Sequence, residues 1–149
     1  MKHEYYMKEA LKEAELAYSK NEVPVGCVIV YNDEIIARTH NLRESLNKAL
    51  AHAEVLAIDE ANRKLQTWRL DSCTLYVTIE PCPMCSGAII QSRISNVIYG
   101  AKDYKAGMHS SISNMFELPL NHKVDIQGGV LEKESEMLMK KFFKELRKK

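Results

Sequence analysis

The chain has 149 residues, of which 46% are hydrophobic and 28% charged, and its formal net charge is +1. This length and apolar content predict a single globular domain over residues 1–149, which would bury about 70% of the surface that the unfolded chain exposes. Residues 1–18 carry acidic side chains and no continuous apolar core, and no apolar run reaches membrane length. We therefore expect a cytoplasmic protein without a secretory signal or a membrane partner.

The first part of the chain predicts a helix followed by a hairpin. Apolar residues recur at helical spacing from Met7 to Tyr18, which is typical of an amphipathic helix packed on a core. Residues Val25–Tyr31 and Glu34–His40 are rich in β-formers, and Asn32-Asp33 between them predicts a turn, although the usual glycine is absent. Gly26 in the first strand indicates the close approach of a neighbouring segment or a ligand.

The second part alternates helices and strands. The expected elements are a helix at Ala51–Leu65, a strand at Thr74–Ile79, a helix at Pro83–Arg93, a strand at Val97–Tyr99, a loop at Ala101–Asn114, a strand at Val124–Gln127 and a helix from Leu131. This order predicts an α/β fold with three layers, in which helices cover both faces of a mixed five-stranded sheet. Because open α/β sheets bind ligands at the carboxyl ends of their strands, we expect a site where Thr74–Ile79 ends.

A histidine, a carboxylate and a C-x-x-C pair stand at the predicted starts of two helices. His52 and Glu54 lie in the first turn of one helix, where residues two apart can both approach a metal beyond the helix end, although in a helix interior they would point about 200° apart. Cys82 precedes Pro83, a favoured first helical residue, and Cys85 lies over the same helix end. Helix N-termini also favour thiolates. The pattern predicts one zinc ion held by His52, Cys82 and Cys85, with a fourth position open for water.

Glu54 is surplus to these ligands. Zinc with two thiolates and a neutral imidazole carries no net charge, so it is a weaker Lewis acid than zinc on three histidines, and its water needs a base. We predict that Glu54 is that catalytic base.

Two other uses of the cysteines are weaker hypotheses. A structural zinc ribbon needs a fourth protein ligand, for which Cys27, Cys73, His40 and His122 are the candidates. A redox dithiol would leave His52 and Glu54 unexplained. Cys27 and Cys73 lie in or beside strand patterns, so we expect buried thiols there and not a disulfide.

The C-terminus is strongly basic. The last ten residues hold six basic side chains and one acidic one, a local charge of +5. Leu138, Phe142 and Leu146 predict a buried stripe, which leaves Phe143 turned away from it. Two interpretations stay open: a solvated helix end whose lysines complement the dipole, or a phosphate-binding strip on which Phe143 stacks against a base.

The two metal motifs together form the H-x-E and P-C-x-x-C signature known from zinc deaminases of nucleobases. On these motifs the chain resembles the bacterial tRNA-specific adenosine deaminases, within the cytidine-deaminase-like superfamily. The likeness extends over Glu22-Val23-Pro24-Val25-Gly26, His40-Asn41, Val97-Ile98-Tyr99-Gly100-Ala101, Asp103-Tyr104-Lys105-Ala106-Gly107, Asn121-His122 and Phe142-Phe143. Two stretches depart from the family pattern, Ser110-Ser111-Ile112 and Lys48-Ala49-Leu50.

The resemblance implies a function and further site residues. The implied reaction is hydrolysis of adenosine to inosine at the wobble position of a tRNA anticodon, with zinc on the three ligands above and Glu54 as proton shuttle. Asn41 would hold the purine by its amide. The residues implied to bind RNA are Asp103, Lys105, Ser110, Ser111, Asn121, Phe143 and Arg147. The resemblance also implies a homodimer in which each pocket is completed by the partner chain.

Two alternatives share parts of this pattern. A deaminase of free guanine or cytosine would need the same zinc core, but it would have no use for the basic tail or the Asp103 loop. A non-catalytic RNA-binding module with structural zinc would have no use for Glu54.

Overall fold

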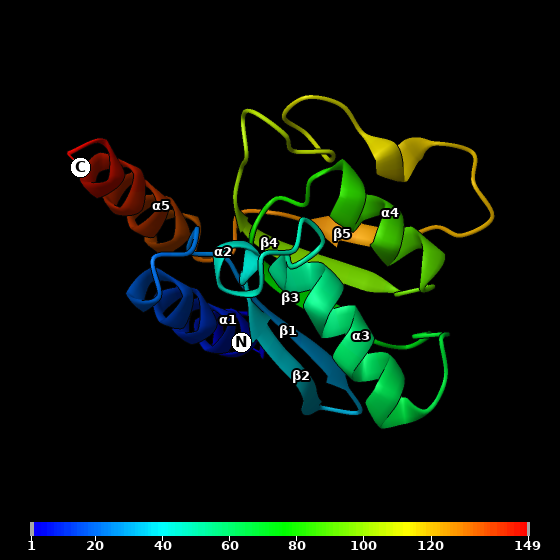
Figure 1. Cartoon of the computed structure of the whole chain (residues 1–149). Coiled ribbons are helices and arrows are strands. Elements are labelled where there is room, and N and C mark those ends of the chain that lie inside the picture. Colours follow the sequence, from blue (N-terminus) through cyan, green and yellow to red (C-terminus); the bar gives the residue numbers. More distant parts are fainter. Residues whose placement is uncertain (1, 149) are drawn as a thin grey trace.

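A five-stranded sheet with the order β2-β1-β3-β4-β5 forms the middle layer of the computed structural model, which describes residues 2–148 (Figure 1). The strands are β1 (Gly26–Tyr31), β2 (Glu34–His40), β3 (Thr74–Ile79), β4 (Asn96–Ala101) and β5 (Asp125–Gln127). β1 runs antiparallel to both β2 and β3, whereas β3, β4 and β5 run parallel to one another. The predicted mixed sheet is confirmed.

Helices cover both faces of this sheet. They are α1 (Lys2–Ser19), α2 (Arg43–Leu46), α3 (Ala53–Leu65), α4 (Pro83–Gln91) and α5 (Glu132–Arg147), with a short 3-10 helix, η1, at Met115–Glu117. α1 and α5 lie on one face, and α3 and α4 lie on the other (Figure 1). None of the helices within residues 2–148 combines the length and the apolar character needed to span a bilayer.

The strand period of two explains how β1 serves both helical layers. Val28 and Val30 belong to the apolar cluster that contains Met7 of α1, whereas Cys27 and Ile29 belong to the cluster on the α3 side. Cys27 and Cys73 are buried free thiols, as expected. β1 therefore packs against both helical layers.

Gly26 and the hairpin turn behave as the sequence indicates. A Cβ atom on Gly26 would lie 1.9 Å from the carbonyl oxygen of Ala10 and 2.4 Å from the amide nitrogen of Ala14, so the close neighbour is the backbone of α1. Asn32 and Asp33 have φ angles of 50° and 63°. Positive φ at both positions is the conformation of a type I′ turn, which suits the twist of a hairpin.

The predicted element ends need several corrections. α3 begins at Ala53 and not at Ala51, because His52 is the extended N-cap residue. α4 ends at Gln91 and not at Arg93, whose φ of 67° is left-handed. α1 begins earlier than Met7, and β4 is longer than Val97–Tyr99. α2 and η1 were not predicted, because elements of three or four residues are too short to show a period.

The predicted buried stripe of α5 is partly wrong. Phe142 is buried and packs edge-on against Tyr18, with ring centroids 6.1 Å apart. Leu146, however, is 51% exposed. Leu146 lines a shallow hollow together with Tyr18, near the end of α1, and is only partly covered there. Lys149, counted above in the basic run, lies outside the described residues.

Candidate active site

The predicted metal ligands meet where two helices begin. His52 is the N-cap residue of α3, and Cys82 is the N-cap residue of α4 with Pro83 directly after it. Neither helix is capped by its own N-cap side chain. β3 ends at Ile79, so α4 begins just beyond the carboxyl end of that strand. The site therefore lies at the sheet edge that the α/β pattern predicts.

The distances between these ligands fit zinc. Nδ1 of His52 lies 3.6 Å from the sulfur of Cys82 and 3.5 Å from that of Cys85. In a tetrahedral site with Zn–S of about 2.3 Å and Zn–N of about 2.05 Å, sulfur and nitrogen lie about 3.6 Å apart. Among residues 2–148, Cys27, Cys73, His40 and His122 do not join this group of ligands. A ribbon with four protein ligands therefore finds no support in the described chain.

The lowered pKa of Cys82 also favours a metal. Hydrogen bonds from Cys85 and His52 lower the pKa of Cys82 to about 4, so this sulfur is a thiolate at neutral pH. The hydrogen bond to Cys82 and burial both raise the pKa of Cys85. Because metals bind thiolates, occupation of the site releases the Cys85 proton.

Glu54 lies in the same pocket and is not a ligand. Its side chain is only 3% exposed, and burial raises its pKa to about 7, with the charge of Cys82 adding to the rise. A carboxyl group with this pKa can both accept and return a proton near neutral pH.

The pocket over these residues has a volume of about 190 Å³. Asn41 lies in its wall, and its side-chain oxygen accepts a hydrogen bond of 2.7 Å from the amide of Ala53. The Asn41 NH₂ group therefore remains as a donor for a ligand. The pocket is lined by Val23, Val25, Asn41, Arg43, His52, Glu54, Ile79, Glu80, Cys82, Asp103 and Met139.

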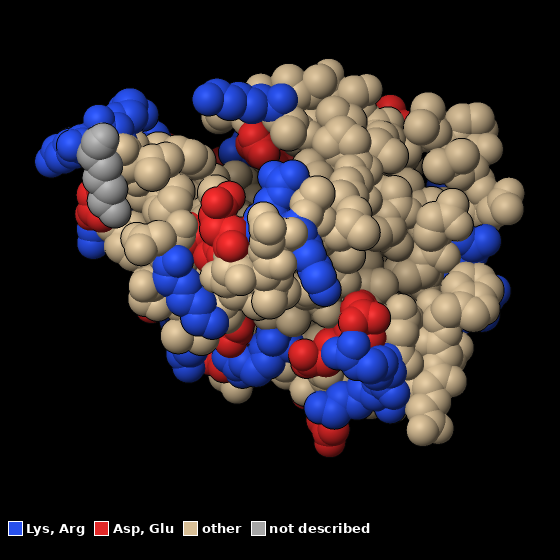
Figure 2. All heavy atoms as spheres, in the orientation of Figure 1, with Lys and Arg blue, Asp and Glu red and all other residues tan. Residues whose placement is uncertain are grey.

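A second, wider hollow of about 680 Å³ adjoins the first and shares Val23, Ile79, Asp103 and Met139 with it. It lies between α5 and the loop after β4, and Figure 2 shows Lys and Arg side chains on both sides of it. Four residues implied to bind RNA line this hollow: Asp103, Lys105, Phe143 and Arg147. Lys102, Lys140 and Lys144 also line it, so its walls are cationic.

Comparison with known proteins agrees with this geometry. The family model of MafB19-like deaminases matches residues 1–147. A tRNA-specific adenosine deaminase of Bacillus subtilis (strain 168) is 54% identical over 98% of this chain and 91% of its own length. One from Aquifex aeolicus (strain VF5) is 51% identical over 99% of this chain and 97% of its own. The chain belongs to the tRNA-specific adenosine deaminases.

The solved structures similar to this chain include a tRNA deaminase and a guanine deaminase, and the two match it to different extents. A structure from work on tRNA:A34 deaminases, which edit A to I at the wobble position, has a TM-score of 0.87 and 41% identity, and the match covers 90% of this chain and 98% of that one. A guanine deaminase from Bacillus subtilis is also 41% identical, but its TM-score is 0.65 and the match covers 68% of this chain and 66% of that one. The fold is the cytidine-deaminase-like fold that the resemblance implies.

Ser110 and Ser111 have internal roles in this member of the family. Their amides donate to Oε2 of Glu80 at 2.8 and 3.2 Å, and the Ser111 hydroxyl donates to Oε1. The amides of Asp103 and His109 donate to the same carboxylate. Glu80 is 1% exposed, so one buried carboxylate holds the whole loop that borders both pockets. Sequence reasoning missed Glu80, and its only signal was a charge at the end of an apolar strand.

Asn121 lies away from the pocket of its own chain. Asn121 is exposed. Nε2 of the next residue, His122, lies 2.6 Å from the carbonyl oxygen of Ile94, which comes just before β4 begins, so this segment lies near the amino end of that strand. The metal ligands lie beyond the opposite ends of the strands. The structure therefore does not bring Asn121 together with the other predicted residues.

Proposed function

We propose that this chain binds one zinc ion through His52, Cys82 and Cys85 and hydrolyses adenosine to inosine at the wobble position of a tRNA anticodon. The observation that carries the proposal is the convergence of three zinc-type ligands, at the separations of a tetrahedral site, beside a buried carboxylate that is not a ligand. The close relatives supply the choice of substrate.

The mechanism follows from the positions of these groups. Bound zinc would lower the pKa of a water molecule and so make it nucleophilic at neutral pH. Glu54 takes a proton from the attacking water and delivers it to N1 of adenine, which makes C6 electrophilic. The water oxygen then bonds to C6. Glu54 takes the remaining proton from that oxygen and passes it to the exocyclic amine, so that the C6–N bond breaks, ammonia leaves and the C6 carbonyl of inosine forms. One carboxylate thus performs each proton transfer.

The narrow pocket is suited to holding one flipped base. Val23, Val25 and Ile79 provide apolar wall, and the free NH₂ of Asn41 can donate to a ring acceptor such as N7 of a purine. A base in an anticodon loop is already partly unstacked, so extruding it into the pocket costs less than from a duplex.

The wider hollow is suited to the flanking nucleotides. Phe143 is 38% exposed and can stack on a base, while Lys105, Lys144 and Arg147 can neutralise phosphates. The side chain of Asp103 accepts from the amides of Lys105 and Ala106, at 3.1 and 3.2 Å, which shapes the loop on the other wall. Ser110 and Ser111 contribute by holding this loop on Glu80.

We further propose that the protein works as a homodimer in the cytoplasm. Ile112, Leu118 and Leu120 are exposed on the segment that leads past α4, and such apolar side chains suit a contact with a second copy. Because Asn121 lies on the same segment, its role in RNA binding requires the partner chain. Measurement of the mass in solution tests the dimer.

The decisive experiment compares two substrates. Turnover on an anticodon stem-loop with adenosine at the wobble position is measured against turnover on free guanine at matched concentration. The same stem-loop with adenosine only at another loop position is the control. We expect inosine in the first RNA alone, and one zinc ion per chain by metal analysis. Efficient deamination of guanine with an inert stem-loop would favour the free-base alternative, which the guanine deaminase relative makes the second candidate.

A further inference from the structure

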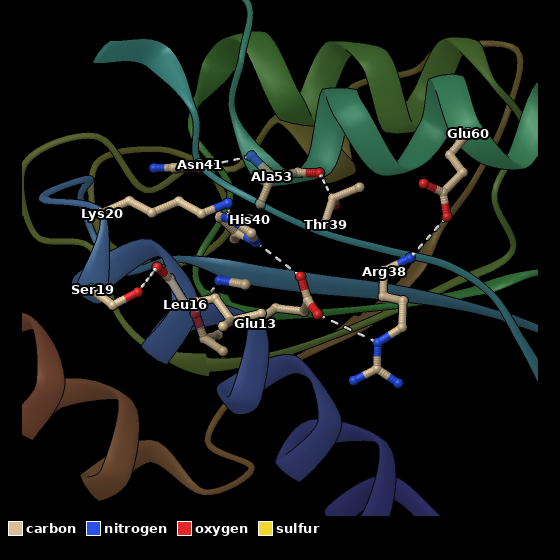
Figure 3. Close-up of polar contacts among 12 residues, drawn as sticks. Glu13, Leu16, Ser19, Lys20, Arg38, Thr39, His40, Asn41, Ala53 and Glu60 are labelled. Carbon is tan, nitrogen blue, oxygen red and sulfur yellow. Dashed lines mark hydrogen bonds and ion pairs between the residues drawn. The ribbon is translucent and has the colours of Figure 1, made fainter. Parts of the chain in front are cut away.

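Ala53 stands between the metal ligand His52 and the catalytic base Glu54. One side chain near the end of β2 and one directly after that strand hold the Ala53 backbone from both sides. Oδ1 of Asn41 accepts from the Ala53 amide at 2.7 Å, and the Thr39 hydroxyl donates to the Ala53 carbonyl oxygen at 2.7 Å (Figure 3). The first bond restrains the peptide that follows His52, and the second restrains the peptide that precedes Glu54.

The start of α3 needs such support because the side chain of its N-cap residue, His52, is directed toward the two cysteines. The first amides of a helix have no partner within the helix, and an N-cap side chain usually satisfies one of them. His52 occupies the N-cap position of α3 and makes no capping hydrogen bond, because its Nδ1 faces the two cysteines. Asn41 therefore provides, from outside the helix, an acceptor for one of these first amides, and Thr39 adds a bond to the carbonyl oxygen of the same residue.

The end of β2 is itself anchored on the other face of the sheet. Side chains alternate along a strand, so Thr39 and Asn41 point to α3 while His40 points to α1 (Figure 3). Nδ1 of His40 lies 2.9 Å from a carboxylate oxygen of Glu13, and Nε2 lies 3.0 Å from the ammonium of Lys20. An ammonium can only donate, so Nε2 accepts and the Nδ1 proton goes to Glu13. Because β2 is an edge strand, these bonds tie down an end that has only one neighbouring strand.

We propose that Thr39 is a positioning residue for the active site, which acts through Ala53 to set the direction of His52 and Glu54. This inference rests on the proposed zinc chemistry. Thr39 is half-buried and does not line the substrate pocket, so its action on catalysis passes through the backbone that it holds. The peptide it restrains belongs to the same turn as both functional side chains, and a small rotation there would move both.

The test replaces the hydroxyl without changing the shape of the side chain. Thr39→Val removes the hydrogen bond, and Thr39→Ser keeps it while removing the methyl group. Thr74→Val is the matched control, because Thr74 lies at the far end of β3 and makes no side-chain hydrogen bond among the described residues. Each variant is measured for kcat and KM on the stem-loop, for zinc affinity by chelator competition, and for the ligand-field spectrum with cobalt in place of zinc.

We expect Thr39→Val to lower both kcat and zinc affinity by about ten-fold, as is common for groups that orient metal ligands, with KM changed less than about two-fold. The cobalt spectrum should shift, Thr39→Ser should restore the parental values, and Thr74→Val should leave them unchanged.

Parental spectrum, affinity and kcat in Thr39→Val would overturn the proposal. So would equal impairment of Thr39→Ser, or a loss of kcat matched by a loss of folded protein in urea denaturation. If the parent were inactive on the stem-loop, the proposed function would fail, while affinity and spectrum would still test Thr39.

Discussion

In the proposed mechanism the carboxylate of Glu54 performs every proton transfer. Glu54→Gln keeps the size of the side chain but cannot carry a proton. A general acid or base contributes about 10²–10⁴-fold, so we expect a loss of turnover at or beyond the upper end of that range. Inosine formation on the stem-loop measures the rate, and metal analysis should still find one zinc ion per chain. A variant with more than about a tenth of the parental rate would exclude Glu54 as the shuttle.

The packing of α1 on β1 depends on the absence of a side chain at Gly26. In Gly26→Ala the new Cβ would meet the carbonyl oxygen of Ala10 at 1.9 Å, so the helix must move away from the strand. Overpacking of this kind costs about 1–3 kcal/mol, and urea denaturation should show a fall of that size in the free energy of unfolding.

Gly87 provides the matched control for Gly26. It lies within α4, and a Cβ added there would meet nothing within 4 Å. Since alanine is a better helix former than glycine, Gly87→Ala should raise stability by up to about 1 kcal/mol. Parental stability in Gly26→Ala would show that α1 is not held close to the strand.

The last turns of α5 test the proposed RNA surface at the level of an element. Lys144 and Arg147 line the wide hollow, so changing both to Gln should remove two phosphate contacts. The slope of log affinity for tRNA against log salt should then become shallower by about 1.4, since each contact to single-stranded RNA contributes about 0.7. Lys8 and Lys64, exposed on α1 and at the end of α3, are changed to Gln as the control pair. An equal slope in parent and variant would show that these two cations are solvated at the helix end and do not contact phosphates.

Metal binding should stabilise the whole molecule, because the ligands come from two helices and zinc would join them. At free zinc of about 100 times the dissociation constant, binding to the folded state alone adds about 2.7 kcal/mol. We therefore expect a chelator to lower the thermal midpoint measured by calorimetry, and added zinc to restore it. Cys82→Ser should respond much less to either addition. An identical response in that variant would place the stabilising metal elsewhere.

Local patterns predicted most of the elements, and long-range packing decided their ends. Asn32-Asp33 predicts a turn because it separates two β-rich runs, and the hairpin turns there with positive φ at both residues, which Asn and Asp tolerate. The apolar period of α5 predicts a buried Leu146, yet a period cannot show how completely a neighbouring segment covers that position. The same limit applies to α2, whose four residues contain no full period.

The sequence by itself determined the candidate metal ligands and the proposed catalytic carboxylate, because each is a chemical type at a helix start, and caps, proline and strand ends mark such starts locally. Only the tertiary structure decided which polar residues support them. Glu80, Thr39 and the separated Asn121 have ordinary sequence surroundings, and their roles depend on which backbone atoms lie within hydrogen-bond distance. Those distances are set when the sheet brings segments together that are remote in the chain, and no local pattern records them.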